Sequence, residues 1–200
     1  MSSANSLTVE DLGSAAQRER RKRILDATIA LASQGGFDAV QMRAVAEQAD
    51  VALGTLYRYF PSKIHLLVSA LGREFEKAEA LVRERPVPGD TSAERVIHIL
   101  KLTSRGLQGD AHLTEALTRA FMFADASVAT EIHQVGMLMS SMLTRAMHPD
   151  HTDITEEDVA IAKVIGDVWL SALVAWVTGR SSAADTGNQI EVAVNLLLRD

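Results

Sequence analysis

The stretch from residue 41 to residue 63, QMRAVAEQADVALGTLYRYFPSK, constrains the fold of this chain more than any other part of the sequence. Its first half has apolar residues at the i, i+3, i+4 and i+7 spacing of one helix face, and a corner follows at Asp50. A second short helix is expected from Leu53; Pro61 cannot continue it, and Ser62 can cap the next helix. The stretch therefore predicts two short helices at a tight corner, followed directly by a third.

The second short helix has two faces of different chemistry. Its inward positions hold Leu53, Leu56 and Phe60, whereas its outward positions hold hydrogen-bonding side chains. A short helix with such an outward face has the shape and chemistry to lie in a DNA groove. The alternative is a small three-helix module that is packed for stability alone. The outward residues are Thr55, Tyr57, Arg58 and Tyr59.

The order of these segments resembles the helix-turn-helix of TetR-type transcriptional regulators. The similarity runs from about Arg18 to Lys77 and includes a first helix, the pair Gly35-Gly36, the corner, and the run GTLYRYFPSK. It implies an all-α fold, with an N-terminal helix-turn-helix head for double-stranded DNA and a larger helical body for ligand binding and dimerisation. The family's DNA-facing positions fall in this sequence on Gln41, Arg43, Thr55, Tyr57, Arg58, Tyr59 and Lys63.

These positions suit different kinds of DNA contact. Arg58 is the strongest candidate for reading a base, because a guanidinium can bind O6 and N7 of guanine together, and Arg43 is the second candidate. Tyr57 suits either a thymine methyl or a phosphate. At each position the alternative is an exposed residue that touches no DNA. Phosphate contacts that fix the register are expected from Gln41, Thr55, Tyr59 and Lys63.

Two residues depart from the family pattern. Ala52 stands where the family often has a serine or threonine cap, and Asp50 stands at the corner where glycine is frequent. Both departures affect how the recognition helix is set on DNA, and neither removes the motif.

The net charge of −6 is unevenly distributed along the chain. Residues 1–63 carry 8 Lys and Arg against 7 Asp and Glu, while residues 64–200 carry 12 against 19. The run RERRKR at residues 18–23 is the densest basic segment. A local basic patch governs contact with phosphates, so the acidic total does not exclude a DNA-binding protein. A solvated helix end is the alternative interpretation of this run.

Composition excludes several classes of protein. The 200 residues contain no cysteine, which rules out disulfides, thiol catalysis and thiolate metal sites. No phosphate-binding loop or metalloprotease motif occurs, so we expect no enzyme, no catalytic residue and no cofactor. The histidines and aspartates of residues 148–153 are explained by a polar loop, and no metal site is expected. The first residues resemble no signal peptide, so a cytoplasmic protein is expected.

Caps and breaks divide the chain. The first helix is expected over residues 15–34. Capping boxes at Thr91-Glu94 and Thr155-Asp158 are predicted to start two later helices. Residues 181–187 are expected to be a loop or a frayed helix start. The segment RPVPGD at residues 85–90 is the clearest break. The expected parts are a disordered arm at 1–14, the DNA-binding domain at 15–63 with a linking helix at 62–83, and the ligand-binding and dimerisation domain at 84–200.

The helix expected over residues 155–178 is apolar nearly all round. Between residues 159 and 177 its strongly polar residues, Lys163, Asp167 and Ser171, form a single stripe. The stretch after Asp167 is shorter than the roughly 20 residues that span a bilayer, so no membrane contact is expected. The helix is instead predicted to pack on its own core and, together with the last helix, on a second copy of the chain in a homodimer.

Large apolar side chains in the body suit either a core or a ligand cavity. Two body segments, LTEALTRAFMFADASVATEIHQV and VIGDVWLSALVAW, are similar to the TetR-type repressors of cholesterol and steroid catabolism. That similarity implies a steroid-derived effector, the coenzyme A thioester of a 3-oxo-cholestenoic acid. The alternative function is an acyl-CoA- or sterol-binding protein or enzyme with a non-functional head. The residues expected to line the pocket are Leu117, Phe121, Met122, Met137, Trp169, Leu173 and Trp176.

Overall fold

The computed structural model describes residues 9–150 and 153–199, and this part of the chain is helical without strands, which confirms the predicted all-α fold. Its elements are α1 (Val9–Ala39), α2 (Met42–Gln48), α3 (Leu53–Tyr59), α4 (Lys63–Glu84), α5 (Ser92–Gln108), α6 (Ala111–Met122), the 3-10 turn η1 (Ala126–Val128), α7 (Ala129–Met147), α8 (Glu156–Val177) and α9 (Ala183–Leu197).

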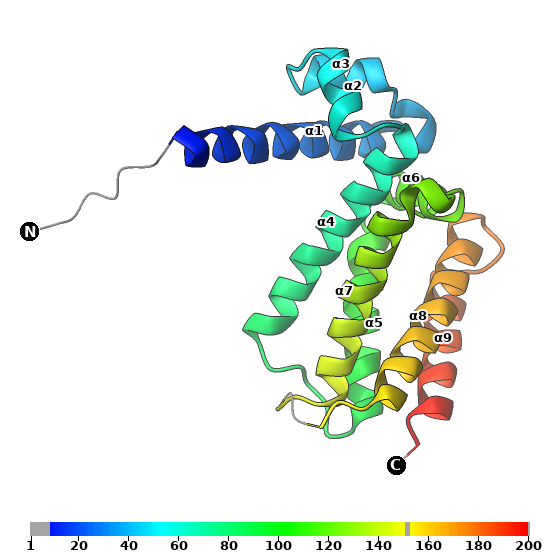
Figure 1. Cartoon of the computed structure of the whole chain (residues 1–200). Coiled ribbons are helices and arrows are strands. Elements are labelled where there is room, and N and C mark those ends of the chain that lie inside the picture. The colour runs from blue at the N-terminus through cyan, green and yellow to red at the C-terminus, as the bar shows by residue number, and fades with distance from the viewer. Residues whose placement is uncertain (1–8, 151–152, 200) are drawn as a thin grey trace, which may run out of the picture.

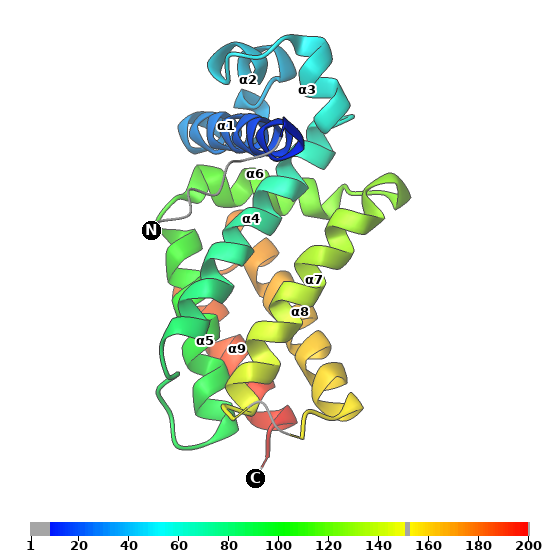
Figure 2. The same ribbon diagram turned by 60° about the vertical axis from the view of Figure 1, so that its left-hand side comes forward.

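The helices form a small head above a longer body. Figures 1 and 2 place α2 and α3 on the side of α1 that faces away from the body, and the helices of the body run lengthwise below. α6 lies across the top of the body directly beneath α1 (Figure 2), and the two helices are in extensive contact. The helix α4 leaves the head and continues down the body, where it packs on α6 and α7. α4 and α6 are therefore the two connections between head and body.

The first helix differs from its predicted limits at both ends. It begins at Val9, so part of the predicted arm is helical, while the rest of that arm lies outside the described residues. Helical geometry is interrupted at Gly35 and Gly36, where the sequence predicts the end of the helix. Gly36 has φ 67°, and a Cβ at this residue would lie 2.6 Å from Oε2 of Glu115 in α6. Glycine thus permits the left-handed turn and leaves room for the carboxylate of Glu115.

The two residues that depart from the family pattern, Asp50 and Ala52, both lie at the corner between α2 and α3. Asp50 adopts φ 53°, a left-handed conformation that aspartate tolerates better than most residues. Ala52 caps α3 without any side-chain hydrogen bond. The corner is therefore built by backbone conformation and by burial of Val45 and Leu56 beneath it.

Local capping explains where most of the other helices begin. Both predicted capping boxes are formed, at Thr91 with Glu94 and at Thr155 with Asp158. The hydroxyl of Ser62 accepts a hydrogen bond from the backbone N–H of His65 at 3.3 Å and starts α4. The last helix begins at Ala183, inside the segment predicted to be a loop or frayed start, because Ser182 caps it.

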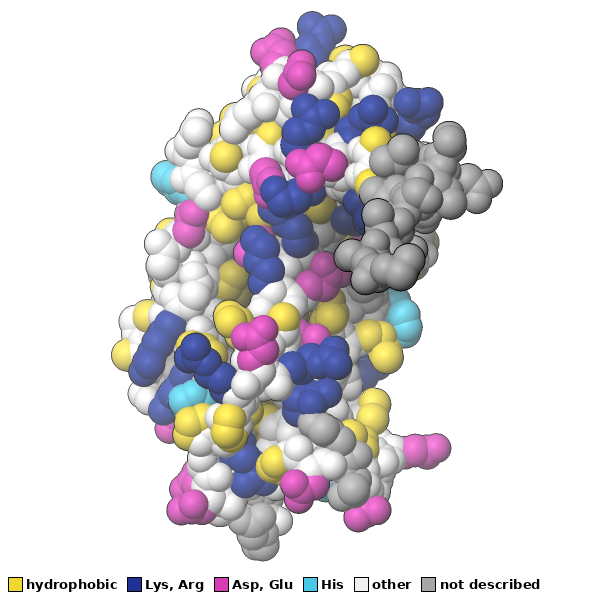
Figure 3. Space-filling view, turned by 90° about the vertical axis from the view of Figure 1, so that its left-hand side faces the viewer, with side chains coloured by type: hydrophobic (Ala, Val, Ile, Leu, Met, Phe, Trp, Pro, Cys, Tyr) yellow, Lys and Arg dark blue, Asp and Glu magenta, His cyan; other side chains and the backbone are white. Residues whose placement is uncertain are grey.

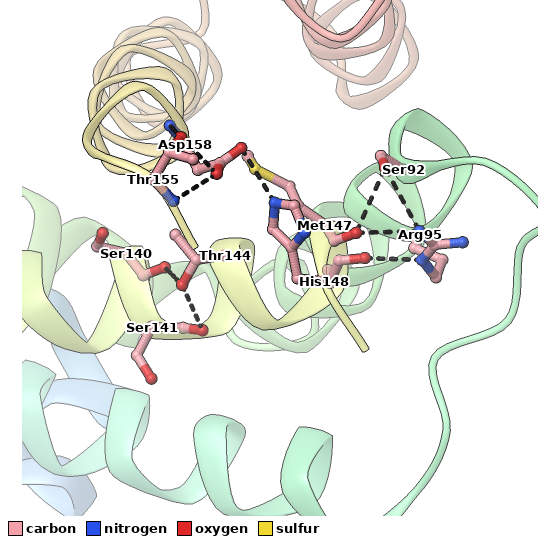
Figure 4. Close-up of polar contacts among 10 residues, drawn as sticks. Ser92, Arg95, Ser140, Ser141, Thr144, Met147, His148, Thr155 and Asp158 are labelled. Carbon is pink, nitrogen blue, oxygen red and sulfur yellow. Dashed lines mark hydrogen bonds and ion pairs between the residues drawn. The ribbon is translucent and has the colours of Figure 1, made fainter. Parts of the chain in front are cut away.

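At the lower end of the body, Arg95 connects the end of α7 with the loop between α4 and α5 (Figure 4). Its guanidinium donates to the carbonyl oxygen of Ala146 at 2.7 Å, to that of Met147 at 3.1 Å, and to that of Gly89 at 3.2 Å. The first two carbonyls belong to the last turn of α7, which lacks partners inside its own helix. A cation there also suits the negative end of the helix dipole, so Arg95 ties the α4–α5 loop to α7.

Asp158 stabilises the first turn of α8, as Figure 4 also shows. Its Oδ2 accepts hydrogen bonds from the backbone N–H of Thr155 at 2.8 Å and from the Thr155 hydroxyl at 2.7 Å. Its Oδ1 lies 3.1 Å from Nε2 of His148. The hydrogen bond from the Thr155 backbone, followed by that from the Thr155 hydroxyl, lowers the pKa of Asp158 to about 2.

Replacing Asp158 with asparagine is expected to lower the free energy of unfolding by about 1 kcal/mol at pH 7, because the charged acceptor is lost. A carboxyl whose pKa is depressed by folding stabilises above its unfolded pKa, and this contribution disappears as the pH falls from about 4 toward about 2. Urea denaturation at pH 5 and pH 3 should show a difference between wild type and variant that shrinks at pH 3. Glu157→Gln, in the same turn, is the control for net charge. A pH-independent difference would contradict this role.

Candidate nucleic-acid interface and ligand cavity

The recognition helix α3 presents the predicted face at the top of the head. Leu56 and Phe60 are buried beneath it, while Tyr57 is 46% exposed and Arg58 is exposed. Thr55 and Tyr59 are half-buried on the same helix. The other predicted contacts, Gln41 and Arg43, are exposed at the start of α2. Because α2 and α3 lie on the outer side of α1, these side chains share the end of the molecule that is farthest from the body (Figure 1).

Lys63 does not extend outward with the recognition helix. Its Nζ lies 3.9 Å from the ring centroid of Phe37, and the side chain is half-buried between head and body. Burial lowers the pKa of Lys63 from its usual value. The sequence suggested a phosphate contact, but the residues that surround Lys63 come from α1 and from the distant helix α6, which the local sequence does not reveal.

The basic run of α1 is partly used inside the head. Nζ of Lys22 pairs with Asp26 at 3.0 Å, and Nη1 of Arg23 lies 3.7 Å from Asp50. The Arg21 guanidinium lies over the ring of Phe60, 5.5 Å from its centroid. On the face shown in Figure 3, Lys and Arg side chains in the upper half are accordingly interspersed with acidic ones. Part of this run therefore stabilises the packing of α1 on the recognition helix.

A cluster of five residues, the junction cluster, joins the head to α6. It consists of Phe37 and Asp38 at the end of α1, Lys63 at the start of α4, and Glu115 and Arg119 in α6. Oε2 of Glu115 accepts a hydrogen bond from the backbone N–H of Phe37 at 2.8 Å. Cζ of Arg119 lies 4.4 Å from the Phe37 ring centroid, and its Nη1 lies 3.4 Å from Asp38. Two cations therefore contact one aromatic ring, and two carboxylates offset their charge.

A cavity of about 450 Å³ lies in the upper body between α4, α6, α7 and α8. This volume is within the range of roughly 300–1,000 Å³ that is usual for small-molecule sites. Trp169 forms part of the buried wall; its indole N–H donates to Oγ of Ser104 at 3.0 Å, and its ring packs edge-on against Phe75. Exposed lining residues form the mouth of the cavity between α7 and α8. They are His133, Gly136, Met137, Val159, Lys163 and Asp167.

Five of the residues predicted for the pocket line this cavity, namely Leu117, Phe121, Met137, Trp169 and Leu173. Met122 and Trp176 do not line it. Met122 is the last residue of α6 and is 54% exposed, and Trp176 lies near the end of α8. The sequence analysis missed Thr118 and all of the mouth residues except Met137. Thr118 lies one turn from Thr114 and beside Leu117 on the same face, so helical spacing without a hydrophobicity filter would have included it.

The helix α8 is more apolar than its burial in one protomer requires. It has 22 residues and, by length and composition alone, could cross a membrane, although only 28% of its most apolar window is buried. This length corrects the sequence argument, which considered only the stretch after Asp167. In the described structure α8 packs on α7 and α9 within the helical body. Its outer face and that of α9 leave Val164, Val192 and Leu196 exposed.

Comparison with known proteins finds two family models that match the chain. Residues 24–70 match the family model of bacterial regulatory proteins of the tetR family, and residues 89–197 match that of the tetracyclin repressor-like C-terminal domain. The chain is 61% identical over 197 residues to the HTH-type transcriptional repressor KstR of Rhodococcus jostii strain RHA1, covering 98% of this chain and 91% of that protein.

Solved structures have the same fold. A TetR transcriptional regulator from Rhodococcus sp. RHA1 is 30% identical, aligns with 92% of this chain and 98% of its own, and superposes with a TM-score of 0.84. FadR of Thermus thermophilus, a TetR-family transcriptional repressor solved in complex with lauroyl-CoA, is 20% identical, aligns with 89% of this chain and 93% of its own, and has a TM-score of 0.68.

Proposed function

Because this chain belongs to the TetR family of bacterial transcriptional regulators, we propose that it is a homodimeric repressor that binds a palindromic operator and is released by a steroid-derived CoA thioester. Its targets are genes of cholesterol and lipid catabolism, and it acts on DNA in the cytoplasm without a membrane partner. The relatives are named as transcriptional repressors, which supports a regulator and not an enzyme.

The observation that carries this proposal is that α6 contacts both the cavity and the DNA-binding head. One face of the helix lines the cavity with Leu117, Thr118 and Phe121. Another face carries Glu115 and Arg119, which contact the end of α1. A ligand in the cavity therefore touches the same helix that positions the DNA-binding head. A carrier or enzyme with a non-functional head would have no need of this connection.

The chemistry of the cavity supports a long amphipathic effector. Its buried wall is mostly apolar, whereas its mouth carries Lys163 and His133 together with the carboxylate of Asp167. FadR proteins of this fold have been solved with lauroyl-CoA and stearoyl-CoA, so the fold accommodates CoA thioesters. The steroid portion of the proposal is supported by the sequence similarity to KstR. We assign the apolar portion of the effector to the wall and the CoA portion to the mouth.

The proposed dimer uses the exposed apolar faces of α8 and α9, which a second copy would cover in a four-helix interface. Two recognition helices must then meet successive major grooves, about 34–36 Å apart. An effector releases the repressor if it favours a state in which this spacing is wrong. A coupling of about 1–3 kcal/mol weakens operator binding roughly 5- to 150-fold, and DNA must weaken effector binding by the same factor.

The direct test measures binding of the wild-type protein to a labelled promoter fragment with and without the CoA thioester of a 3-oxo-cholestenoic acid. We expect specific binding that weakens at saturating thioester. Lauroyl-CoA as a second ligand separates a steroid-responsive from a fatty-acid-responsive repressor. A protein that binds the thioester but never prefers the operator to random DNA would be a carrier.

Arg58 is proposed to read a guanine, so Arg58→Ala should cost about 1–3 kcal/mol on the operator and relax the preference at one base pair per half-site. Arg58→Lys is the matched variant, because it keeps the charge but loses the planar fork. If Arg58 instead contacts a phosphate, the lysine variant will bind the operator nearly as well as wild type does. Fluorescence anisotropy on operator and random DNA distinguishes these outcomes.

A further inference from the structure

The hydroxyl of Thr118 has no hydrogen-bond partner in the described structure. The residue is 4% exposed and lines the cavity from α6. Other buried threonines use their hydroxyls within the protein: Thr28 and Thr144 donate to the carbonyl oxygen four residues earlier, at 2.8 and 2.9 Å. Thr114, one turn before Thr118, donates to the carbonyl oxygen of Leu107 at 2.6 Å. The Thr118 hydroxyl differs from these threonines: it has no partner in the described protein and belongs to the cavity lining, so a molecule in the cavity can form a hydrogen bond with it.

The buried wall around Thr118 offers a ligand few other hydrogen-bonding groups. Nearby wall residues, including Leu117 and Phe75, are apolar, and the indole N–H of Trp169 is already bound to Ser104. Ser140, on α7, also lacks a partner for its hydroxyl but is only half-buried. The charged lining residues belong to the exposed mouth. A ligand that enters through the mouth thus meets charge first and a hydroxyl in the buried wall.

We propose that the Thr118 hydroxyl binds a carbonyl or hydroxyl oxygen at the end of the effector that enters the cavity first. This inference rests on the proposed function and narrows the ligand class to effectors that carry an oxygen at their buried end. A plain fatty acyl chain ends in a methyl group and leaves Thr118 unpaired. A site built to hydrogen-bond a ligand oxygen discriminates against the analogue that lacks it, because a buried polar group then stays unsatisfied.

The test uses two probes that differ by one atom group: the CoA thioester of a 3-oxo-cholestenoic acid and the same thioester without the ring ketone. Isothermal titration of the full chain should show wild type preferring the ketone about 10-fold, the scale of one buried hydrogen bond. Thr118→Val should remove this preference while binding the deoxo thioester as wild type does. Thr118→Ser should retain the preference, and circular dichroism checks that both variants are folded.

Three outcomes are decisive. If Thr118→Val keeps the wild-type preference, Thr118 does not bind the ligand oxygen. If wild type binds both thioesters equally, the inference fails while the proposed function stands. If wild type binds neither thioester, the proposed function itself is overturned and the inference with it.

Discussion

Replacing Val164 with glutamate is expected to convert the repressor into monomers and to lower its operator affinity at least about 100-fold, because the second half-site is no longer bound in the same molecule. Val164 is 46% exposed on the outer face of α8. In a dimer built on this face, the new carboxylate would be buried without a partner, which costs roughly 3–5 kcal/mol. Analytical ultracentrifugation at micromolar concentration and operator anisotropy measure the two effects.

Leu81→Glu is the matched control for this variant. It also places a carboxylate at an exposed aliphatic position, but on α4, away from α8 and α9 (Figure 1). The control should sediment and bind DNA as wild type does. A wild-type chain that is monomeric at micromolar concentration would contradict the proposed assembly, and so would a Val164→Glu variant that remains dimeric.

The parts of the fold that could be predicted from sequence are those that depend on nearby residues. The capping boxes at Thr91 and Thr155 form within one helical turn, and the break at Gly35-Gly36 reflects the conformational freedom of glycine itself. The start of the last helix at Ala183 was harder to predict, because residues 181–187 have turn-like composition. There a serine cap outweighs low helix propensity.

The parts that could not be predicted depend on partners far apart in sequence. Lys63 lies against Phe37, and Glu115 reaches the same residue across 78 positions. Met122 was predicted to line the pocket, but α6 ends there and the side chain is exposed. Thr118 was overlooked because a threonine does not stand out in a hydrophobic stripe. Helical spacing identifies a face, whereas only the tertiary structure shows what that face meets.

The junction cluster is the most direct path between cavity and head. Oε2 of Glu115 accepts a hydrogen bond from the backbone N–H of Phe37 at 2.8 Å, beside Gly36, where the absence of a Cβ leaves room for the carboxylate. The same α6 carries Phe121 on the face that lines the cavity. A shift of α6 on ligand binding would therefore move the end of α1, and with it the helix-turn-helix. The hydrogen bond of Glu115 is a contact in this path that a single substitution removes.

Glu115→Ala is expected to uncouple the two sites. Operator affinity with saturating thioester should approach that without it, so that the wild-type ratio of roughly 5- to 150-fold falls close to 1. Thioester affinity measured without DNA should change little, because Glu115 does not line the cavity. Glu84→Ala, which removes an exposed carboxylate at the end of α4, should keep the wild-type ratio. Fluorescence anisotropy on the operator, with titration calorimetry for the ligand, measures both quantities. If Glu115→Ala responds to the thioester as wild type does, the Glu115 hydrogen bond does not carry the signal, which must then pass through the contacts of Arg119 with α1 or through α4.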